Sequence, residues 1–522
     1  MANKNIFGSA DVAVPTADTV NEAGGKAYQM SEKASLAQYA VTGTFNNTFY
    51  ASAKTQLDKT LEMTRKVDSV FLAKLAVYAR KDGYMKDMPA FLLAVLAGRS
   101  DAQSCLCFEK AFPLVIDNGK MLRNFVQIMR SGAIGRRSLG SKAKRLIKKW
   151  FNRDANRIFK DSIGNNPSLG DVLKLSHPHP ASKQHEALFA YLVGKKAKSK
   201  NLPDIVKQYE AFKADPYNSE VPNVPFQFLA SLDIPERVWK DIARNGGWHM
   251  VRMNLNTFNR HGVFNDSEMV KMVADKLCDE DQIRKSRVFP YQLLAAYLNA
   301  DCRIPMKITN ALQDAMEIAT QNVPRFGENV FVLPDVSGSM HSSVTGFRNG
   351  ATSKVSCIDV AALVASSILR TTPEAEVMPF STSVCKCRLN PRDSVMTNAK
   401  KLARLGGGGT NCGAPLEKIF DSGSKVDLVI YVSDNQSWID SNNSWGYRVG
   451  TSVATTWSKI KRKNRNAKMV CIDIQPYDTV QVPDDKSVMN IGGFSDQIFT
   501  TIDNFVQGSN EHWVKVIEKV EI

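Results

Sequence analysis

The chain has 522 residues, enough for two or more domains, and its 43% hydrophobic and 23% charged content is ordinary for a globular protein with a full core. The sequence has no run of 18 apolar residues and no apolar segment at its N-terminus, so we expect neither a membrane span nor a secretory signal. Nine scattered cysteines without zinc-type spacing predict a reduced, cytoplasmic protein.

The net charge of +16 is distributed unevenly. Residues 1–325 hold 47 of the 68 Lys and Arg residues and 32 of the 52 Asp and Glu residues, whereas the rest of the chain is close to neutral. An excess of positive charge on one part of a chain indicates a polyanionic partner, most often nucleic acid. A soluble basic protein without such a partner has the same composition, so this alternative stays open.

Helical patterns follow one another from about Ser31 to Met316, separated by Gly, Pro or Asn residues. Serial helices without strands favour an α-solenoid over an irregular bundle, although no strict period marks the repeats. The predicted helices include Ser69–Arg80, Met88–Ala97, Phe112–Met129, Ser182–Val193, Ser267–Leu277 and Pro290–Leu298.

One stretch of this part is strongly basic: residues 120–160 contain 13 basic residues and one acid, Asp154. On a single helix over 142–160, five basic side chains would fall within about 80° of each other, opposite an apolar flank. Such a ridge suits the phosphates of a nucleic acid, with binding that weakens steeply with salt. A solvated charged face and a membrane-surface helix are the alternatives. The candidate contacts are Lys142, Arg145, Lys149, Arg153 and Lys160, preceded by Arg136 and Arg137.

Beyond about Phe326, apolar runs typical of strands alternate with helical ones. This alternation predicts a doubly wound α/β fold with a parallel sheet, so we expect domains over residues 1–325 and 326–522. The predicted strands are Val330–Leu333, Glu376–Phe380, Asp427–Val432 and Lys468–Ile474, and the helices between them include Ser356–Arg370, Ser394–Ala403 and Thr451–Arg462.

Oxygen-bearing side chains follow two of these strands. Asp335, Ser337 and Ser339 come after the first strand, Asp434 comes after the strand at Val432, and Thr410 follows a run of four glycines. Ligands bind beyond the carboxyl ends of strands in such sheets, and hard oxygen ligands suit Mg²⁺ or Mn²⁺. The alternatives are loop oxygens that only cap helices, or a purely structural ion. The glycine run lacks the Lys-Ser/Thr of a phosphate-binding loop.

These five positions match the metal-ion-dependent adhesion site of the von Willebrand factor A family, which residues 326–522 resemble. The resemblance implies that the two serines and the threonine contact the ion directly, while the acidic residues often act through water. It also implies a sixth position that is open to an acidic group of a partner. The polar spacer from His341 to Lys354 is longer than we expect for the family, and we expect it to alter access to the metal face.

Further stretches extend a resemblance over nearly the whole chain. The stretches are Leu173–His177, Val41–Tyr50, Phe289–Tyr297, Gly406–Asn411, Val432–Asn435 and Ile491–Phe494. With the metal motif they are similar to the Ro autoantigen family, in which a helical TROVE module precedes a von Willebrand factor A domain.

This resemblance implies a monomeric ring of HEAT-like helical repeats that the A domain closes. It implies binding of small, structured Y-like RNAs on a basic outer surface and of the single-stranded ends of misfolded RNAs in the central hole. It also implies a role in RNA quality control beside an exoribonuclease. On this chain the matching RNA-contacting residues are those of the basic stretch together with His177.

The function that we expect is therefore that of a non-enzymatic RNA-binding protein. The alternative is a metal-dependent protein-interaction module whose basic helices only keep it soluble. An RNA-processing enzyme is disfavoured because the sequence lacks a recognisable nucleophile triad, a two-metal carboxylate cluster and a nucleotide-binding fold.

Overall fold

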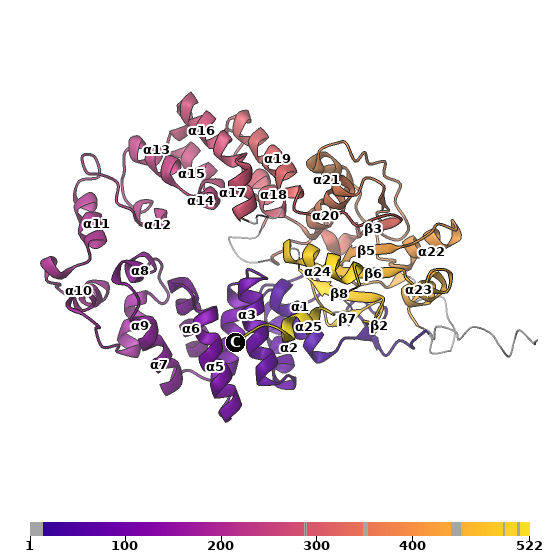
Figure 1. Ribbon diagram of the computed structural model, residues 1–522, viewed down its shortest axis with the longest axis horizontal. Coiled ribbons are helices and arrows are strands. Elements are labelled where there is room, and N and C mark those ends of the chain that lie inside the picture. The colour runs from indigo at the N-terminus through magenta and orange to yellow at the C-terminus, as the bar shows by residue number, and fades with distance from the viewer. Residues whose placement is uncertain are drawn as a thin grey trace, which may run out of the picture. The chain divides into compact units, whose positions relative to one another are not determined.

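The computed structural model describes residues 14–286, 288, 290–347, 353–439, 450–493, 496–508 and 512–522. The chain forms two compact units, each shown with its helices and strands in Figure 1. The first comprises residues 1–63, 283–299 and 313–516, and the second comprises residues 64–282, 300–312 and 517–522. This division differs from the expected boundary at about Phe326, because N-terminal residues fold with the α/β part. Phe289, Phe494 and residues 348–352 of the spacer lie outside the described residues.

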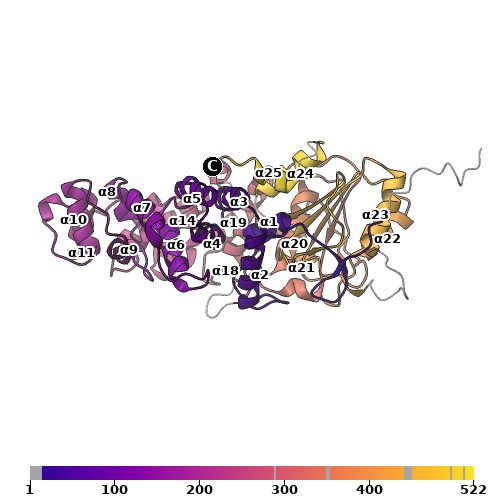
Figure 2. The same cartoon turned by 90° about the horizontal axis from the view of Figure 1, so that it is seen from below.

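The second unit is built from short helices that follow each other in chain order, and consecutive ones such as α3, α4 and α5 pack side by side (Figure 2). Capping residues set their starts: the Asp68 side chain accepts from the Phe71 N–H at the start of α3. The helices are α3 (Ser69–Lys81), α4 (Asp87–Gly98), α5 (Ala102–Val115), α6 (Gly119–Ser131), α7 (Gly140–Trp150), α8 (Ala155–Lys160), α9 (Leu169–Ser176), α10 (Lys183–Leu192), α11 (Asp204–Ala214), α12 (Phe226–Leu229), α13 (Glu236–Asn245), α14 (Trp248–Met253), α15 (Leu255–Arg260) and α16 (Ser267–Leu277).

Two predicted helices are wrong in their continuity. The helix expected over Phe112–Met129 is divided between α5 and α6, because Asn118 caps a new helix by accepting from the Met121 N–H. The helix expected over Lys142–Lys160 is divided between α7 and α8, and there the Asp154 side chain accepts from the Arg157 N–H. The other five helices predicted between Ser31 and Met316 are confirmed within two residues at each end.

The first unit contains the predicted parallel sheet, with the strand order β4-β3-β5-β6-β8. Figure 2 shows this sheet with helices α20 and α21 on one side and α22 and α23 on the other. The strands are β3 (Val330–Pro334), β4 (Glu376–Val377), β5 (Leu428–Ser433), β6 (Lys468–Asp473) and β8 (Val488–Gly492). The helices are α1 (Glu32–Thr42), α18 (Pro290–Asn299), α20 (Cys357–Thr371), α21 (Val395–Ala403), α22 (Gly413–Asp421), α23 (Ser452–Lys463) and α24 (Asp496–Val506).

Four further helices include residues of both units. They are α2 (Ala53–Lys66), α17 (Glu280–Ser286), α19 (Met306–Thr320) and α25 (Trp513–Glu518). None of the helices in the described ranges is long and apolar enough to cross a membrane.

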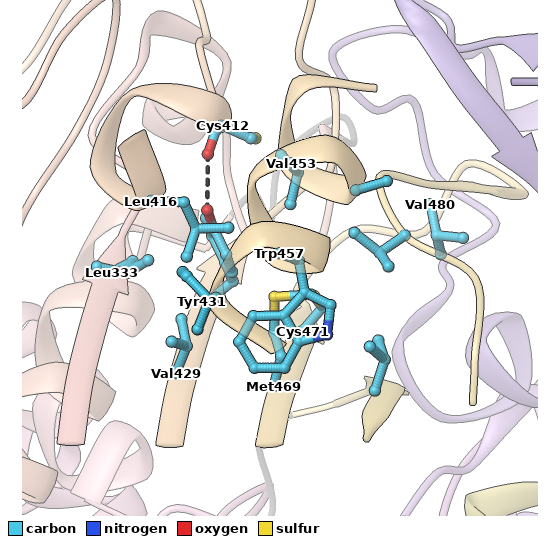
Figure 3. Packing of buried hydrophobic residues seen from close by; sticks show 14 of the residues in the cluster. Leu333, Cys412, Leu416, Val429, Tyr431, Val453, Trp457, Met469, Cys471 and Val480 are labelled. Atoms are coloured by element: carbon cyan, nitrogen blue, oxygen red, sulfur yellow. Dashed lines mark hydrogen bonds between the residues drawn. The ribbon is translucent and has the colours of Figure 1, made fainter. Parts of the chain in front are cut away.

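The core of the first unit follows from the alternation of side chains along its strands. Leu333, Tyr431 and Cys471 come from three neighbouring strands and pack against α22 and α23 (Figure 3). Trp457 of α23 lies in the same cluster, and the Tyr431 hydroxyl donates a 2.7 Å hydrogen bond to the Cys412 carbonyl. The strands are buried on both faces, which explains their continuous apolar runs.

Residues near the N-terminus complete this unit. Strand β2 (Lys26–Gln29) pairs antiparallel with β1 (Thr19–Val20) and with β7 (Thr479–Val480), so a second, small sheet joins the two ends of the sequence. Tyr28 is buried in the core cluster, and α1 packs against β8.

Candidate functional site

Four of the five residues of the predicted metal site follow two strands that end at one edge of the sheet. Strands β3 and β5 are parallel neighbours with Pro334 opposite Val432, so Asp335 and Asp434 leave the sheet side by side. Ser337 and Ser339 lie at the start of a short 3-10 helix (η3, Gly338–His341). The Ser337 and Ser339 hydroxyl oxygens are 3.3 Å apart.

Hydrogen bonds hold the first carboxylate in place. The Ser433 hydroxyl donates to Asp335 Oδ2 at 2.6 Å, and the Ser337 N–H donates to Asp335 Oδ1 at 2.8 Å. Ser433, at the end of β5, was not among the predicted site residues. Its position directly before Asp434 was the available sequence signal.

The glycine run brings Thr410 to the same edge. The Gly338 N–H donates to the Gly408 carbonyl at 3.1 Å, and the Thr410 carbonyl accepts from the Trp438 N–H at 3.1 Å. Gly408 has a φ of +86°, which favours glycine, and a Cβ at Gly409 would lie 2.5 Å from the Trp438 ring. The run therefore allows a close approach of backbone to the loop that carries the serines.

Two carboxylates are buried close together at this edge of the sheet. Burial raises the pKa of Asp335, and burial followed by repulsion from Asp335 raises the pKa of Asp434. Both carboxylates are almost completely buried, and no ion pair to either is found among the described residues. Two buried, ionised carboxylates with no basic partner are unfavourable unless protons or a bound cation neutralise them. Two carboxylates with three hydroxyls form a hard oxygen donor set that fits Mg²⁺ or Mn²⁺.

A third carboxylate lies nearby at the end of β6. Asp473 accepts from Asn435 Nδ2 at 3.0 Å and from the Gln475 N–H at 3.0 Å, and it is fully buried. Among the described residues, no cluster of three or more His, Cys, Asp and Glu side chains is arranged to hold a metal ion. The candidate site thus depends on its hydroxyl groups.

The basic stretch has a different form from the predicted ridge. On α7 the buried side chains Ala143, Leu146, Ile147 and Trp150 form one face. Five basic side chains fill an arc of about 160° on the other side at 100° per residue. They are Lys142, Lys144, Arg145, Lys148 and Lys149, and we call them the α7 basic face. Lys144 and Lys148 were not among the predicted contacts, although the helical spacing of the sequence places them on this face.

The residues predicted to contact RNA differ in whether their side chains are exposed or already bonded to other parts of the protein. Lys149 and Arg137 are exposed, and no ion pair to either occurs within the described ranges. Arg145 forms an ion pair with Glu109, and Lys142 contacts the Cys105 sulfur. The Arg136 guanidinium donates to the Ala97 carbonyl at 3.1 Å.

Arg153, Lys160 and His177 lie beyond α7, outside its basic face. The Arg153 guanidinium donates to the Asp117 carbonyl at 2.8 Å and stacks over the Trp150 ring, while burial lowers its pKa. Lys160 is partly exposed at the end of α8. His177 ends α9 with a left-handed φ of 49°, and its backbone N–H donates to the Leu173 carbonyl at 2.9 Å, which leaves the ring exposed.

Comparison with known proteins relates both units to one type of protein. The Ro60 vWA domain model matches residues 330–506, and the TROVE domain model matches residues 229–307. A relative called RNA-binding protein RO60 in Deinococcus radiodurans is 24% identical over 445 residues, which are 80% of this chain and 83% of that protein. A protein of the same name in Caenorhabditis elegans is 24% identical over 258 residues, 47% of this chain and 38% of that protein.

A solved structure has the same fold. The crystal structure of the Deinococcus radiodurans Ro (RSR) protein superposes with a TM-score of 0.63 at 21% identity, covering 92% of this chain and all of that one. The basic residues discussed above precede the segment that the TROVE model matches. The chain is therefore of the Ro type, with a TROVE domain and a Ro60 von Willebrand factor A domain.

Proposed function

We propose that this chain binds RNA and works as the protein component of a Ro-type ribonucleoprotein. The observation that carries the proposal is the α7 basic face, and two relatives of this chain are named RNA-binding proteins. Basic side chains on one helix face suit phosphates, so binding would depend on the shape and the backbone of the RNA more than on its sequence. The partners that the Ro family implies are small non-coding, Y-like RNAs and the single-stranded ends of misfolded RNAs, in RNA quality control.

The candidate contacts form two groups, those with exposed side chains and those whose side chains bond to the backbone of the protein. Lys149, Lys144 and Arg137 are exposed and available to phosphates, whereas Arg145 would have to leave Glu109 first. Arg136 and Arg153 hold the fold through backbone carbonyls. We therefore propose that the first group contacts RNA and that Arg136 and Arg153 act by positioning α7 and the turn that follows it.

The test is RNA affinity as a function of salt for the Lys144→Glu/Lys149→Glu variant of the full chain. Loss of two phosphate contacts should flatten the plot of log affinity against log salt by roughly 1.4 to 1.8, about 0.7 to 0.9 for each contact. The matched control is Lys271→Glu/Lys307→Glu, which changes the total charge equally on α16 and α19. An equal loss in both variants would mean that net charge alone attracts RNA, and no loss in either would reject the proposed face.

We also propose that Asp335, Ser337, Ser339, Thr410 and Asp434 hold Mg²⁺ or Mn²⁺, and that a sixth position takes an acidic side chain of a partner such as an exoribonuclease. The ion would neutralise the two buried carboxylates and keep positive charge for the partner. Asp335→Ala should abolish binding in a calorimetric Mn²⁺ titration, while Asp421→Ala, an exposed acid at the end of α22, should not. Equal Mn²⁺ affinity in Asp335→Ala and the wild type would refute the assignment.

The remaining proposals are a non-enzymatic role, a monomeric state and a cytoplasmic location. Nine cysteines in the free thiol form are compatible with a reducing compartment. Labelled RNA incubated with the protein and Mg²⁺ should stay at full length, and cleavage that Asp335→Ala abolishes would establish an enzyme instead.

A further inference from the structure

Basic residues are concentrated at the end of α23, within the first unit. Residues 459–468 contain six Lys and Arg residues and no acid, although residues 326–522 as a whole are close to neutral. They run from the last turns of α23 to Lys468, the first residue of β6. Asp335 and Asp434 follow the carboxyl ends of their strands, so this basic stretch lies at the opposite edge of the parallel sheet.

Two of the six basic residues are bonded within the fold itself. Lys461 Nζ donates to the Ala467 carbonyl at 3.1 Å, which closes the turn after α23. Lys468 Nζ donates to the Phe505 carbonyl of α24 and lies 4.7 Å from the centroid of the Phe505 ring. Burial lowers the pKa of both ammonium groups. The other four basic side chains are exposed, and we call them the α23 basic cluster: Lys459, Arg462, Lys463 and Arg465.

The turn that carries Arg465 is fixed against the segment that enters β5. Asn464 Nδ2 donates to the Val426 carbonyl at 2.7 Å and to Asp427 Oδ1 at 3.1 Å. Asp427 Oδ2 lies 3.4 Å from Lys425 Nζ, and it also accepts a hydrogen bond of 2.6 Å from an asparagine amide before β3. The acid next to the turn is therefore already bonded to other groups.

One aromatic ring holds two cations of the cluster close together. Lys463 Nζ lies 3.9 Å from the centroid of the Phe420 ring and Lys459 Nζ lies 5.7 Å from it, so the two nitrogens are at most about 10 Å apart. Glu417 and Asp421 of the neighbouring α22 form no ion pair with either lysine in the described ranges. Like charges four residues apart on a helix repel each other, and the helix macrodipole supplies only about half a negative charge.

The surroundings of the cluster favour a nucleic acid over other acidic partners. No exposed apolar side chain occurs in residues 417–425 and 459–466. Protein interfaces centre on apolar and aromatic side chains, and helices that bind a membrane surface bury an apolar face in it. Phosphate contacts need only exposed cations, so a nucleic acid fits this surface without an apolar centre.

We propose that the α23 basic cluster binds the phosphates of RNA and is a second RNA contact, on the unit that contains the parallel sheet. This inference rests on the RNA binding proposed above and adds a contact outside the unit that carries the α7 basic face. Phe420 acts as a positioning residue, because its ring holds two ammonium groups at a fixed spacing. The contact would follow the RNA backbone and would not depend on base sequence.

The experiment measures the affinity of the full chain for single-stranded oligouridine as a function of salt. Lys459→Gln/Lys463→Gln removes both charges, and the loss of two phosphate contacts should flatten the plot of log affinity against log salt by about 1.4, which is about 0.7 for each contact with a single strand. Lys459→Glu/Lys463→Glu adds repulsion and should lower the affinity further. The matched control is Lys354→Glu/Lys386→Glu, which changes two exposed lysines elsewhere in the same unit and should keep the wild-type slope.

The outcomes separate this contact from RNA binding as such. If the cluster variants keep the wild-type slope while Lys144→Glu/Lys149→Glu flattens it, the inference is overturned and the proposed function stands. Equal losses in the cluster variants and the control would show an effect of net charge alone and would also overturn it. If the wild type binds neither oligouridine nor an RNA hairpin, the proposed function and the inference fail together. Binding of oligoglutamate in place of oligouridine, lost in the cluster variants, would assign an acidic protein partner instead of RNA.

Discussion

At the scale of single residues, the buried Asp473 has a pKa that burial raises to about 7, and its hydrogen bond from Asn435 offsets only part of this effect. A carboxyl group whose pKa is higher in the folded state than in the unfolded chain stabilises the fold at low pH. That contribution is complete below the unfolded pKa of about 3.9 and is lost as the pH rises through about 7. The folded protein therefore holds an unfavourable charge at this position in alkaline buffer.

The Asp473→Asn variant is accordingly expected to be more stable than the wild type at pH 8 in metal-free buffer, by on the order of a few kcal/mol. The amide oxygen can still accept from the Gln475 N–H, and the Asn435 amide can turn to accept from the new amino group. Urea unfolding midpoints at pH 5 and pH 8 check this expectation. The gain should shrink at pH 5, and an equal gain at both values would mean that titration of Asp473 is not its cause.

The sequence could predict the site residues that follow strands, but it could not predict contacts between distant segments of the chain. Asp335 and Asp434 follow recognisable apolar strands, and the same signal marks Asp473 at the end of a predicted strand. The contact between Asn47 and Phe347 gives no such signal, because it joins residues about 300 positions apart. Periodicity reports on neighbours within an element and is blind to contacts of this kind.

At the scale of elements, the sequence predicted one long helix where the structure has a break between α7 and α8. The buried residues Ile147, Trp150 and Ile158 keep a helical spacing across the break, so the apolar pattern alone cannot reveal it. The signal that marks the break is Asp154, whose side chain accepts from the Arg157 N–H at 3.0 Å. His185 of α10 also contacts the turn, with its Nε2 atom 2.8 Å from the Arg153 carbonyl.

Removal of this cap should lower the stability of the second unit. Asp154→Ala leaves the Arg157 N–H of α8 without its side-chain acceptor, and the expected loss is about 1 kcal/mol in the free energy of unfolding. Asn152→Ala, at an exposed position of the same turn, is the control and should change the stability little. Urea unfolding followed by circular dichroism measures both, and equal values for the two variants would contradict the capping role of Asp154.

At the scale of the whole molecule, the sequence indicated the two fold types but not how the chain is shared between them. The change from helical to alternating patterns near Phe326 is real, yet β2 and α1 belong to the unit that contains the parallel sheet. The pairing of β2 with β7 joins Tyr28 to Val480, a contact between residues more than 400 positions apart. Composition and periodicity describe local segments, so they cannot assign such a segment to its unit.

The division into units leads to a last prediction about the two proposed sites. Asp335 lies in the first unit and Lys149 in the second, and residues without shared partners usually have additive effects within about 0.5 kcal/mol. Asp335→Ala should therefore leave RNA affinity unchanged, and Lys149→Glu should leave Mn²⁺ affinity unchanged. The double variant should show the sum of the two single effects in both titrations. A larger deviation in RNA affinity with Mn²⁺ present, but not in its absence, would show that the metal face and the basic face are coupled, and the two sites would then act as one binding surface.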